Sequence, residues 1–168
     1  MYRIQKKKEL DRDYYEKKYD SPYPVDNLMP VYYSVLGHLN SINGKNLNIL
    51  DIGCGMGNLA SLLKKYGYSH YKGFDISSTG IAKAKADIPE WKENFFIHSC
   101  YELKKRQYDY DASIACEVLE HVDDFKLIDQ IKKGSYFIGS VPNYWASGNE
   151  HMRIYKNNLS IKLRFSHA

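Results

Sequence analysis

The 168-residue sequence predicts a single α/β domain built on a doubly wound, mostly parallel sheet. Short apolar runs typical of buried strands alternate with helical patterns between residues 47 and 141. The first run, residues 47–52, leads into a turn with glycines at positions 53, 55 and 57, and a helical pattern begins directly afterwards. A strand, a tight glycine turn and a helix start form a nucleotide-binding corner of such sheets. These observations together indicate a three-layer α/β/α, Rossmann-like fold.

Residues 1–45 are expected to form an N-terminal helical cap. Residues 4–19 have the pattern of a charged helix that places Tyr14, Tyr15 and Tyr19 on one face, and the prolines at 22 and 24 end it. A second helix is predicted from Pro30 to about Leu39, because proline favours a first helical turn and an apolar stripe follows it. The many tyrosines of this region indicate either ordinary surface packing or an aromatic lid over a site. The stripe consists of Val31, Val35, Leu36 and Leu39.

Residues 46–156 are expected to form the core, in which strands alternate with helices and ligands bind at the carboxyl ends of the strands. The predicted strands are 47–52, 71–76, 94–98, 112–116 and 135–141. The predicted helices run from the glycine turn to Gly67, over 79–87 after a cap at Ser77 or Ser78, and over 124–133. The expected buried faces are Leu59, Leu62, Leu63 and Tyr66 in the first helix and Phe125, Ile128 and Ile131 in the last.

The pattern changes after a loop expected at 142–154. Apolar residues then alternate with polar ones, which predicts a strand within residues 157–168. The apolar positions of this alternation are Leu159, Ile161, Leu163 and Phe165. The chain is therefore expected to be one domain, 1–168, whose sheet is shortened at its C-terminus.

Composition limits the possible functions and locations. No apolar run approaches the 18 residues of a membrane span, and the basic N-terminus lacks the apolar core of a secretory signal. The three cysteines form no CxxC pair, which favours a reduced, cytoplasmic protein without disulfides or a zinc site. A net charge of +4 is only weak evidence for a nucleic-acid partner. No feature of the sequence predicts an oligomeric state.

The spacing of the glycines limits the classes of ligand that the turn can bind. A dinucleotide fingerprint needs glycine at position 58, which is Asn58, and no Gly-Lys-Ser/Thr of a P-loop follows. The sequence Asp51-Ile52-Gly53-Cys54-Gly55-Met56-Gly57 closely resembles the first motif of class I S-adenosylmethionine-dependent methyltransferases. The resemblance implies that S-adenosylmethionine is the cofactor and S-adenosylhomocysteine the product. It assigns Gly53, Cys54, Gly55 and Gly57 to the amino-acid end of the cofactor, where a Cβ would collide with the ligand.

Two acidic residues and a polar stretch extend this resemblance. It implies that Asp51 helps to hold the glycine turn and the cofactor amino group, although a purely bracing role is the alternative. Asp75 lies 24 residues further on, at the end of the next strand, where a carboxylate can accept both ribose hydroxyls. Ile76 would then lie on the adenine. The aspartate usual after the third strand is absent, and Ser99 or the backbone near Cys100 is expected to replace it.

A second motif lies at the end of the fourth strand. The run Ala115-Cys116-Glu117-Val118-Leu119-Glu120-His121-Val122 looks like the corresponding motif of ubiquinone-biosynthesis and small-molecule O-methyltransferases. The resemblance places Cys116 and Glu117 at the cofactor, Cys116 through its backbone. It continues at residues 140–143 and 151–155 and so covers about residues 47–156.

The favoured function is transfer of a methyl group to an oxygen, or less readily a nitrogen, of a small-molecule acceptor. His151 and His121 are the candidate bases and Glu120 could orient a histidine, with no metal required. His121 could instead pack beneath the cofactor. An alternative is a metal-dependent RNA 3′-terminal 2′-O-methyltransferase, because Glu117, Glu120, His121 and His151 follow the order E-x-x-E-H…H. A further alternative is a truncated cofactor-binding protein that serves as a partner subunit.

Overall fold

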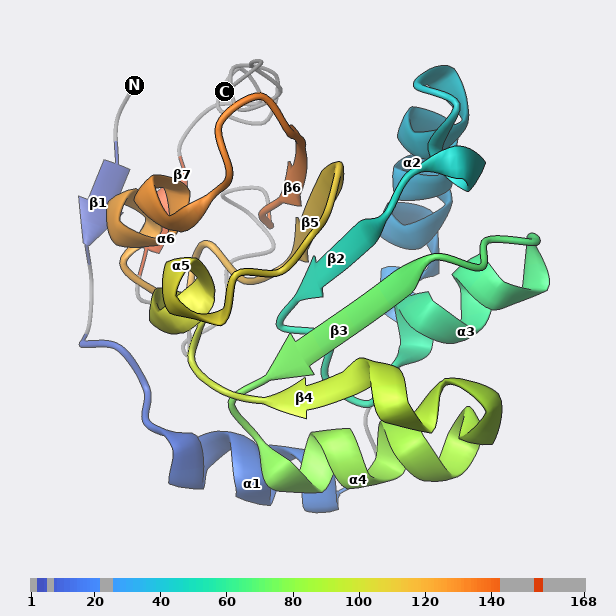
Figure 1. The fold of residues 1–168 in the computed structure, drawn as a ribbon. Coiled ribbons are helices and arrows are strands. Elements are labelled where there is room, and N and C mark those ends of the chain that lie inside the picture. The colour runs from blue at the N-terminus through green and yellow to red at the C-terminus, as the bar shows by residue number, and fades with distance from the viewer. Residues whose placement is uncertain (1–2, 6–7, 22–25, 143–152, 156–168) are drawn as a thin grey trace.

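A five-stranded parallel sheet forms the centre of the protein in the computed structural model, which describes residues 3–5, 8–21, 26–142 and 153–155 (Figure 1). The strand order is β4-β3-β2-β5-β6, and each strand lies parallel to its neighbours. The chain therefore runs outward in one direction from β2 and in the other from β5, which confirms the doubly wound sheet. The strands are β2 (Ile49–Ile52), β3 (Tyr71–Asp75), β4 (Phe95–Ile97), β5 (Ala112–Cys116) and β6 (Tyr136–Ser140).

Helices cover both faces of this sheet, which confirms the three-layer arrangement (Figure 1). Side chains alternate along β2, so Ile49 joins one apolar core while Leu50 and Ile52 join the other. The first core lies under α2 (Met29–Ser41), α3 (Asn58–Lys65) and α4 (Ser78–Asp87), and the second under α5 (Leu103–Arg106) and α6 (Asp124–Gln130). Short 3-10 turns lie at Asp26–Leu28, Gly44–Asn46, Pro89–Asn94 and Cys100–Glu102.

The helices that follow β2 and β3 begin as the sequence predicts. Gly57 adopts a left-handed conformation directly before α3, and the Ser77 side chain accepts a hydrogen bond from the Gly80 N–H at the start of α4. Leu59, Leu62 and Leu63 are buried as expected. Tyr66, which was expected on the same face, follows the last helical residue and is 43% exposed.

The prediction of one helix over residues 4–19 is wrong in its first half. Arg3–Gln5 is a strand, β1, that pairs antiparallel with β7 (Arg153–Tyr155). The helix α1 begins only at Arg12 and runs to Asp20, because Asp11 is extended and its carboxylate caps the Tyr14 N–H at 3.1 Å. β7 lies at the end of the segment 142–154 that was expected to be a loop, and β1 adds a strand to the N-terminal segment 1–45 expected to be helical.

The predicted buried face of the last helix is wrong for two of its three residues. Phe125 and Ile128 are 64% and 38% exposed, whereas Asp124 and Leu127 are fully buried. The helix stops at Gln130, so Ile131 reaches the core from an extended conformation rather than from a helical face. The strand expected within 157–168 lies outside the described residues. Across the described ranges, no helix combines the length and the apolar character that a membrane span requires.

Candidate active site

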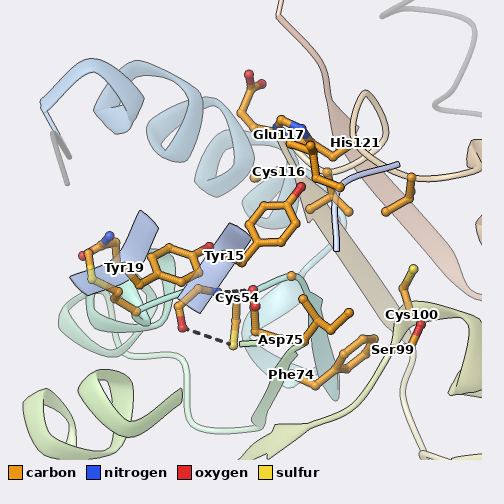
Figure 2. Close-up of a pocket in the computed structure, with 18 of the residues that line it drawn as sticks. Tyr15, Tyr19, Cys54, Phe74, Asp75, Ser99, Cys100, Cys116, Glu117 and His121 are labelled. Atoms are coloured by element: carbon orange, nitrogen blue, oxygen red, sulfur yellow. Dashed lines mark hydrogen bonds between the residues drawn. The ribbon is translucent and has the colours of Figure 1, made fainter. Parts of the chain in front are cut away.

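A pocket opens at the carboxyl ends of β2, β3, β4 and β5, where the strand order reverses, and α1 lies across it (Figure 2). This is the edge at which open α/β sheets bind ligands. The pocket brings together ten of the residues that the sequence assigned to a site. These are Gly53, Cys54, Gly55, Asp75, Ile76, Ser99, Cys100, Cys116, Glu117 and His121.

The glycine turn has a conformation that only glycine adopts readily. Gly53, Gly55 and Gly57 have φ angles of +72°, +54° and +79°. A Cβ on Gly53 would lie 2.6 Å from Val118 Cγ2, and one on Gly57 would lie 3.0 Å from Ala84 Cβ. Protein atoms therefore already fill the space that side chains would need at these two positions. Gly57 packs against α4 and does not line the pocket.

Asp75 joins the glycine turn to the start of α4. Its two carboxylate oxygens accept hydrogen bonds from the Gly55 and Ser77 N–H groups, each at 2.9 Å. The residue is only 6% exposed, and burial raises the pKa of Asp75 although these hydrogen bonds oppose the rise. Each carboxylate oxygen carries a second lone pair, so Asp75 retains acceptor capacity toward a ligand in the pocket.

Asp51 lies behind the turn rather than among the residues that line the pocket. It is 2% exposed, and its carboxylate accepts a hydrogen bond from the Tyr71 hydroxyl at 2.8 Å. Burial raises the pKa of Asp51 to about 7, the charge of Asp75 adds to this, and the Tyr71 hydrogen bond opposes it. This position fits the bracing role that the sequence left open for Asp51.

The wall that follows β4 contains a histidine that sequence reasoning did not single out. His98 is 7% exposed, stacks on Phe74 with ring centroids 3.9 Å apart, and its Nε2 lies 2.8 Å from the Tyr108 hydroxyl. Burial lowers the pKa of His98, which favours the neutral ring. Ser99 and Cys100 continue this wall, and Ser99 accepts a hydrogen bond from the Tyr101 N–H at 3.3 Å. The only sequence signal for His98 is its position directly after a strand that ends at the pocket.

Glu117 directly follows β5 in a left-handed conformation, with φ of +53°. Ser140 on β6 holds it by three hydrogen bonds. The Ser140 hydroxyl donates to Glu117 Oε1 at 2.8 Å, and the Glu117 N–H donates to the Ser140 carbonyl and hydroxyl oxygens at 3.2 and 3.1 Å. Burial raises the pKa of Glu117, opposed by the Ser140 hydrogen bond. A non-glycine residue held in this conformation at a pocket is a typical feature of functional sites.

The candidate general base and its neighbour lie one turn further on. His121 lines the pocket, and its Nε2 lies 3.7 Å from Oε1 of Glu120, which is 1% exposed. His151, the other candidate base, lies outside the described residues. Within the part of the chain that the structure describes, no three histidine, cysteine, aspartate or glutamate side chains are arranged to hold a metal ion.

Two tyrosines of α1, in the tyrosine-rich segment for which the sequence left an aromatic lid open, form part of the pocket lining. Tyr15 and Tyr19 both line it, and Figure 2 shows Tyr15 between Asp75 on one side and His121 on the other. The rings of Tyr15 and His121 meet edge to face at a centroid distance of 6.1 Å. Burial raises the pKa of Tyr15 well above its usual range, and the charges of Asp75 and Glu120 raise it further.

Comparisons with known proteins identify the family of the chain. A family model described as a methyltransferase domain matches residues 29–163. Ubiquinone biosynthesis O-methyltransferases are similar in sequence: the mitochondrial protein of Dictyostelium discoideum is 31% identical over 58% of this chain and 36% of its own length. The protein of Rickettsia canadensis is 33% identical over 65% of this chain and 48% of its own length. The chain thus spans about a third to a half of the length of these relatives.

A solved structure is also similar. The methyltransferase domain of bacterial CtHen1-C superimposes with a TM-score of 0.53 at 27% sequence identity. The match covers 80% of this chain and 73% of that one.

Proposed function

This chain belongs to the methyltransferase-domain family, which confirms the resemblance to S-adenosylmethionine-dependent enzymes, and we propose that it transfers a methyl group from that cofactor to an oxygen of a small-molecule acceptor. The proposal depends most on one observation. Asp75 and the glycine turn, which the sequence assigned to the cofactor, lie in the same pocket and are joined by the hydrogen bond from Gly55 to Asp75.

The residues of the pocket fit S-adenosylmethionine. Asp75 would accept the ribose hydroxyls with its remaining lone pairs, and Ile76 and the wall at Ser99 and Cys100 would hold the adenine. The backbone of the glycine turn and of Cys116 would face the amino-acid end. When bound, the cofactor supplies an electrophilic methyl group for direct displacement.

The chain's own contribution to transfer is to position the acceptor and accept its proton. His121 is the described residue best placed for the proton, because it lines the pocket beside Tyr15. Glu120, 3.7 Å from its Nε2, would orient the ring and stabilise its protonated form. His151 is a second candidate base on sequence grounds.

The charge of the pocket supports a neutral or cationic acceptor. Among the described residues that line it, Glu9, Asp75 and Glu117 are acidic and none is lysine or arginine. Such a lining would repel a phosphorylated or carboxylated acceptor and leave its charge without a partner. The relatives named for ubiquinone biosynthesis favour oxygen over nitrogen as the acceptor atom.

Calorimetry with S-adenosylhomocysteine tests the cofactor half of the proposal. Wild type should release or absorb heat on binding, and Asp75→Asn should bind far more weakly, because an amide cannot accept from both Gly55 and Ser77 and also from a ribose. Asp87→Asn, an exposed carboxylate at the end of α4, is the matched control. Circular dichroism verifies that each variant is folded. Absence of heat from wild type at millimolar ligand would overturn the proposal.

A panel of alcohols, phenols and amines of different charge tests the acceptor half. Transfer should occur to neutral or cationic members and fall when a carboxylate is added to the same scaffold. Cofactor binding without transfer to any member would favour the non-catalytic alternative, a cofactor-binding partner subunit.

A metal-dependent RNA 3′-terminal methyltransferase is the second candidate. The order of Glu117, Glu120, His121 and His151 in the sequence supports it. The acidic lining of the pocket argues against it, because RNA carries negative charge. Among the residues that the structure describes, no group of three possible metal ligands supports it either. Methylation of a 3′-terminal ribose that a chelator abolishes and Mn²⁺ or Mg²⁺ restores would establish this function in place of the first.

A further inference from the structure

The helix α1 is held on the rest of the protein by aromatic and by polar contacts. No residue of α1 is fully buried, but Tyr14, Tyr15 and Tyr19 are partly buried. Its main polar attachment is the Glu16 carboxylate on the first turn of α4. Oε1 accepts from the Ser78 N–H and hydroxyl at 2.8 and 2.7 Å, and Oε2 accepts from the Ser77 hydroxyl and the Thr79 N–H at 2.7 and 2.8 Å.

This carboxylate is well matched to its position. The first turn of a helix has unpaired N–H groups and a partial positive charge, which favour an anion. Burial alone would raise the pKa of Glu16, but the hydrogen bonds from Ser78, Thr79 and Ser77 outweigh it and hold the pKa well below its usual range. Lys83 on α4 also donates a hydrogen bond to the Tyr19 carbonyl, so α1 and α4 are joined at a second point.

The attachment site is continuous with the pocket although Glu16 does not line it. Ser77 donates its hydroxyl to Glu16 and its N–H to Asp75, so one residue contacts both carboxylates. At the other end of α1, the Tyr19 ring lies directly on two glycines. A Cβ on Gly55 would be 2.8 Å from the Tyr19 hydroxyl, and one on Gly80 would be 3.0 Å from its ring.

We propose that Glu16 is a positioning residue that holds α1 closed over the pocket and thereby sets the rate at which the cofactor leaves. Tyr15 and Tyr19 close the pocket because Glu16 fixes the helix that carries them. The inference rests on the proposed function for the identity of the ligand, but the attachment of α1 can be measured without any ligand.

Glu16→Gln is the most direct variant, because it keeps the shape of the side chain but replaces an acceptor of two hydrogen bonds by an amide donor. The dissociation rate of S-adenosylhomocysteine should rise about tenfold, as expected for the loss of charge-assisted hydrogen bonds. In the ligand-free protein, trypsin should cleave faster after Lys17 and Lys18 of α1, because cleavage requires local opening of the helix. Asp13→Asn, an exposed acid on the same helix, should change neither measurement.

Three outcomes separate the possible failures. Unchanged trypsin cleavage in Glu16→Gln overturns the role of Glu16 in holding α1. Faster cleavage with unchanged ligand dissociation overturns the control of cofactor exchange. Absence of ligand binding in wild type overturns the proposed function and with it the role of α1 in cofactor release. The cleavage rates still decide whether Glu16 holds α1 in place.

A second variant guards against a general loss of structure. Ser78→Ala removes one hydroxyl donor and leaves the backbone donors in place, so it should accelerate dissociation less than Glu16→Gln. In a Glu16→Ala background it should add no further acceleration, since no side-chain oxygen is left at position 16 to accept from Ser78. The thermal midpoint of all these variants should stay near that of wild type, because none of them removes a buried apolar side chain. Additive effects, or a large fall in the midpoint, would contradict a positioning role.

Discussion

At the scale of single residues, Asp51 should make the protein less stable as the pH rises, which is the opposite of the effect of a carboxylate whose pKa is lowered on folding. Its pKa rises from 3.8 to about 7 on folding through burial, so the folded state binds the proton more tightly. Stability should therefore fall as the pH rises between these values, by at most about 1.4 kcal/mol per unit. Asp51→Asn should remove this component, as urea unfolding at pH 5, 6 and 7 would measure. Tyr71→Phe removes the opposing hydrogen bond and should extend the decline to higher pH. If the free energy of unfolding changed with pH in the same way for wild type and Asp51→Asn, the raised pKa of Asp51 would be contradicted.

Two glycines, one in crowded and one in open surroundings, test whether the turn that carries the site is strained. Gly53→Ala should destabilise the protein by about 2–4 kcal/mol, since it combines a left-handed backbone with a clash against Val118. Gly37→Ala in α2 should instead stabilise it by about 0.5–1 kcal/mol, because a Cβ there has no atom within 4 Å and alanine favours the helix. Chemical denaturation of both variants provides the measurement. Equal effects of the two substitutions would argue against a strained turn.

The same residues show what sequence reasoning can and cannot reach at this scale. The glycine spacing predicts the tight turn because left-handed conformations and close packing both select glycine. It does not reveal that Asp51 would face Tyr71 while Asp75 faces the pocket, because this depends on the strand register, which pairs Asp51 with Gly73 and places Asp75 two residues further along. His98 is unpredictable for a similar reason, since its role depends on Phe74 and Tyr108 from other elements.

At the scale of elements, α6 is where the pattern of apolar residues misleads. Phe125 and Ile128 have helical spacing, but they lie on the exposed face of a seven-residue helix and Leu127 is the residue that reaches the core. Leu127→Ala should therefore cost about 2–5 kcal/mol of unfolding free energy. Phe125→Ala should cost no more than about 0.5 kcal/mol. Urea unfolding of both variants would settle which face is buried, and the reverse order would support the original prediction.

Elements with a local start or stop signal were the most predictable. The strand at Ala112–Cys116 and the helix capped by Ser77 agree closely with expectation, because a continuous apolar run and a side-chain cap are local features. The strand β1 was missed because its pairing with β7 joins residues about 150 positions apart, and charged residues give no strand pattern of their own. Nonlocal pairing of this kind leaves no signal in a sequence window.

At the scale of the whole molecule, charge is distributed unevenly. The chain has a net charge of +4, yet the described residues that line the pocket include three acids and no lysine or arginine. Basic residues gather instead at places such as α5, which carries Lys104, Lys105 and Arg106 in its last turn. The overall charge, which is readable from the sequence, therefore gives a poor guide to the ligand that the site accepts.

This uneven charge predicts which adenosine compounds stabilise the protein. S-adenosylhomocysteine at a hundred times its Kd should raise the free energy of unfolding by about 2.7 kcal/mol, which corresponds to roughly 5–10 °C in the thermal midpoint for a chain of this size. ATP without divalent ions shares the adenosine but should give no comparable shift, because the described lining offers its phosphates no cationic partner and places Asp75 and Glu117 nearby. Differential scanning calorimetry at matched ligand concentrations makes the comparison. Stabilisation by ATP equal to that by S-adenosylhomocysteine would show that the acidic lining does not select the ligand, whereas no shift with either compound would count against the cofactor site itself.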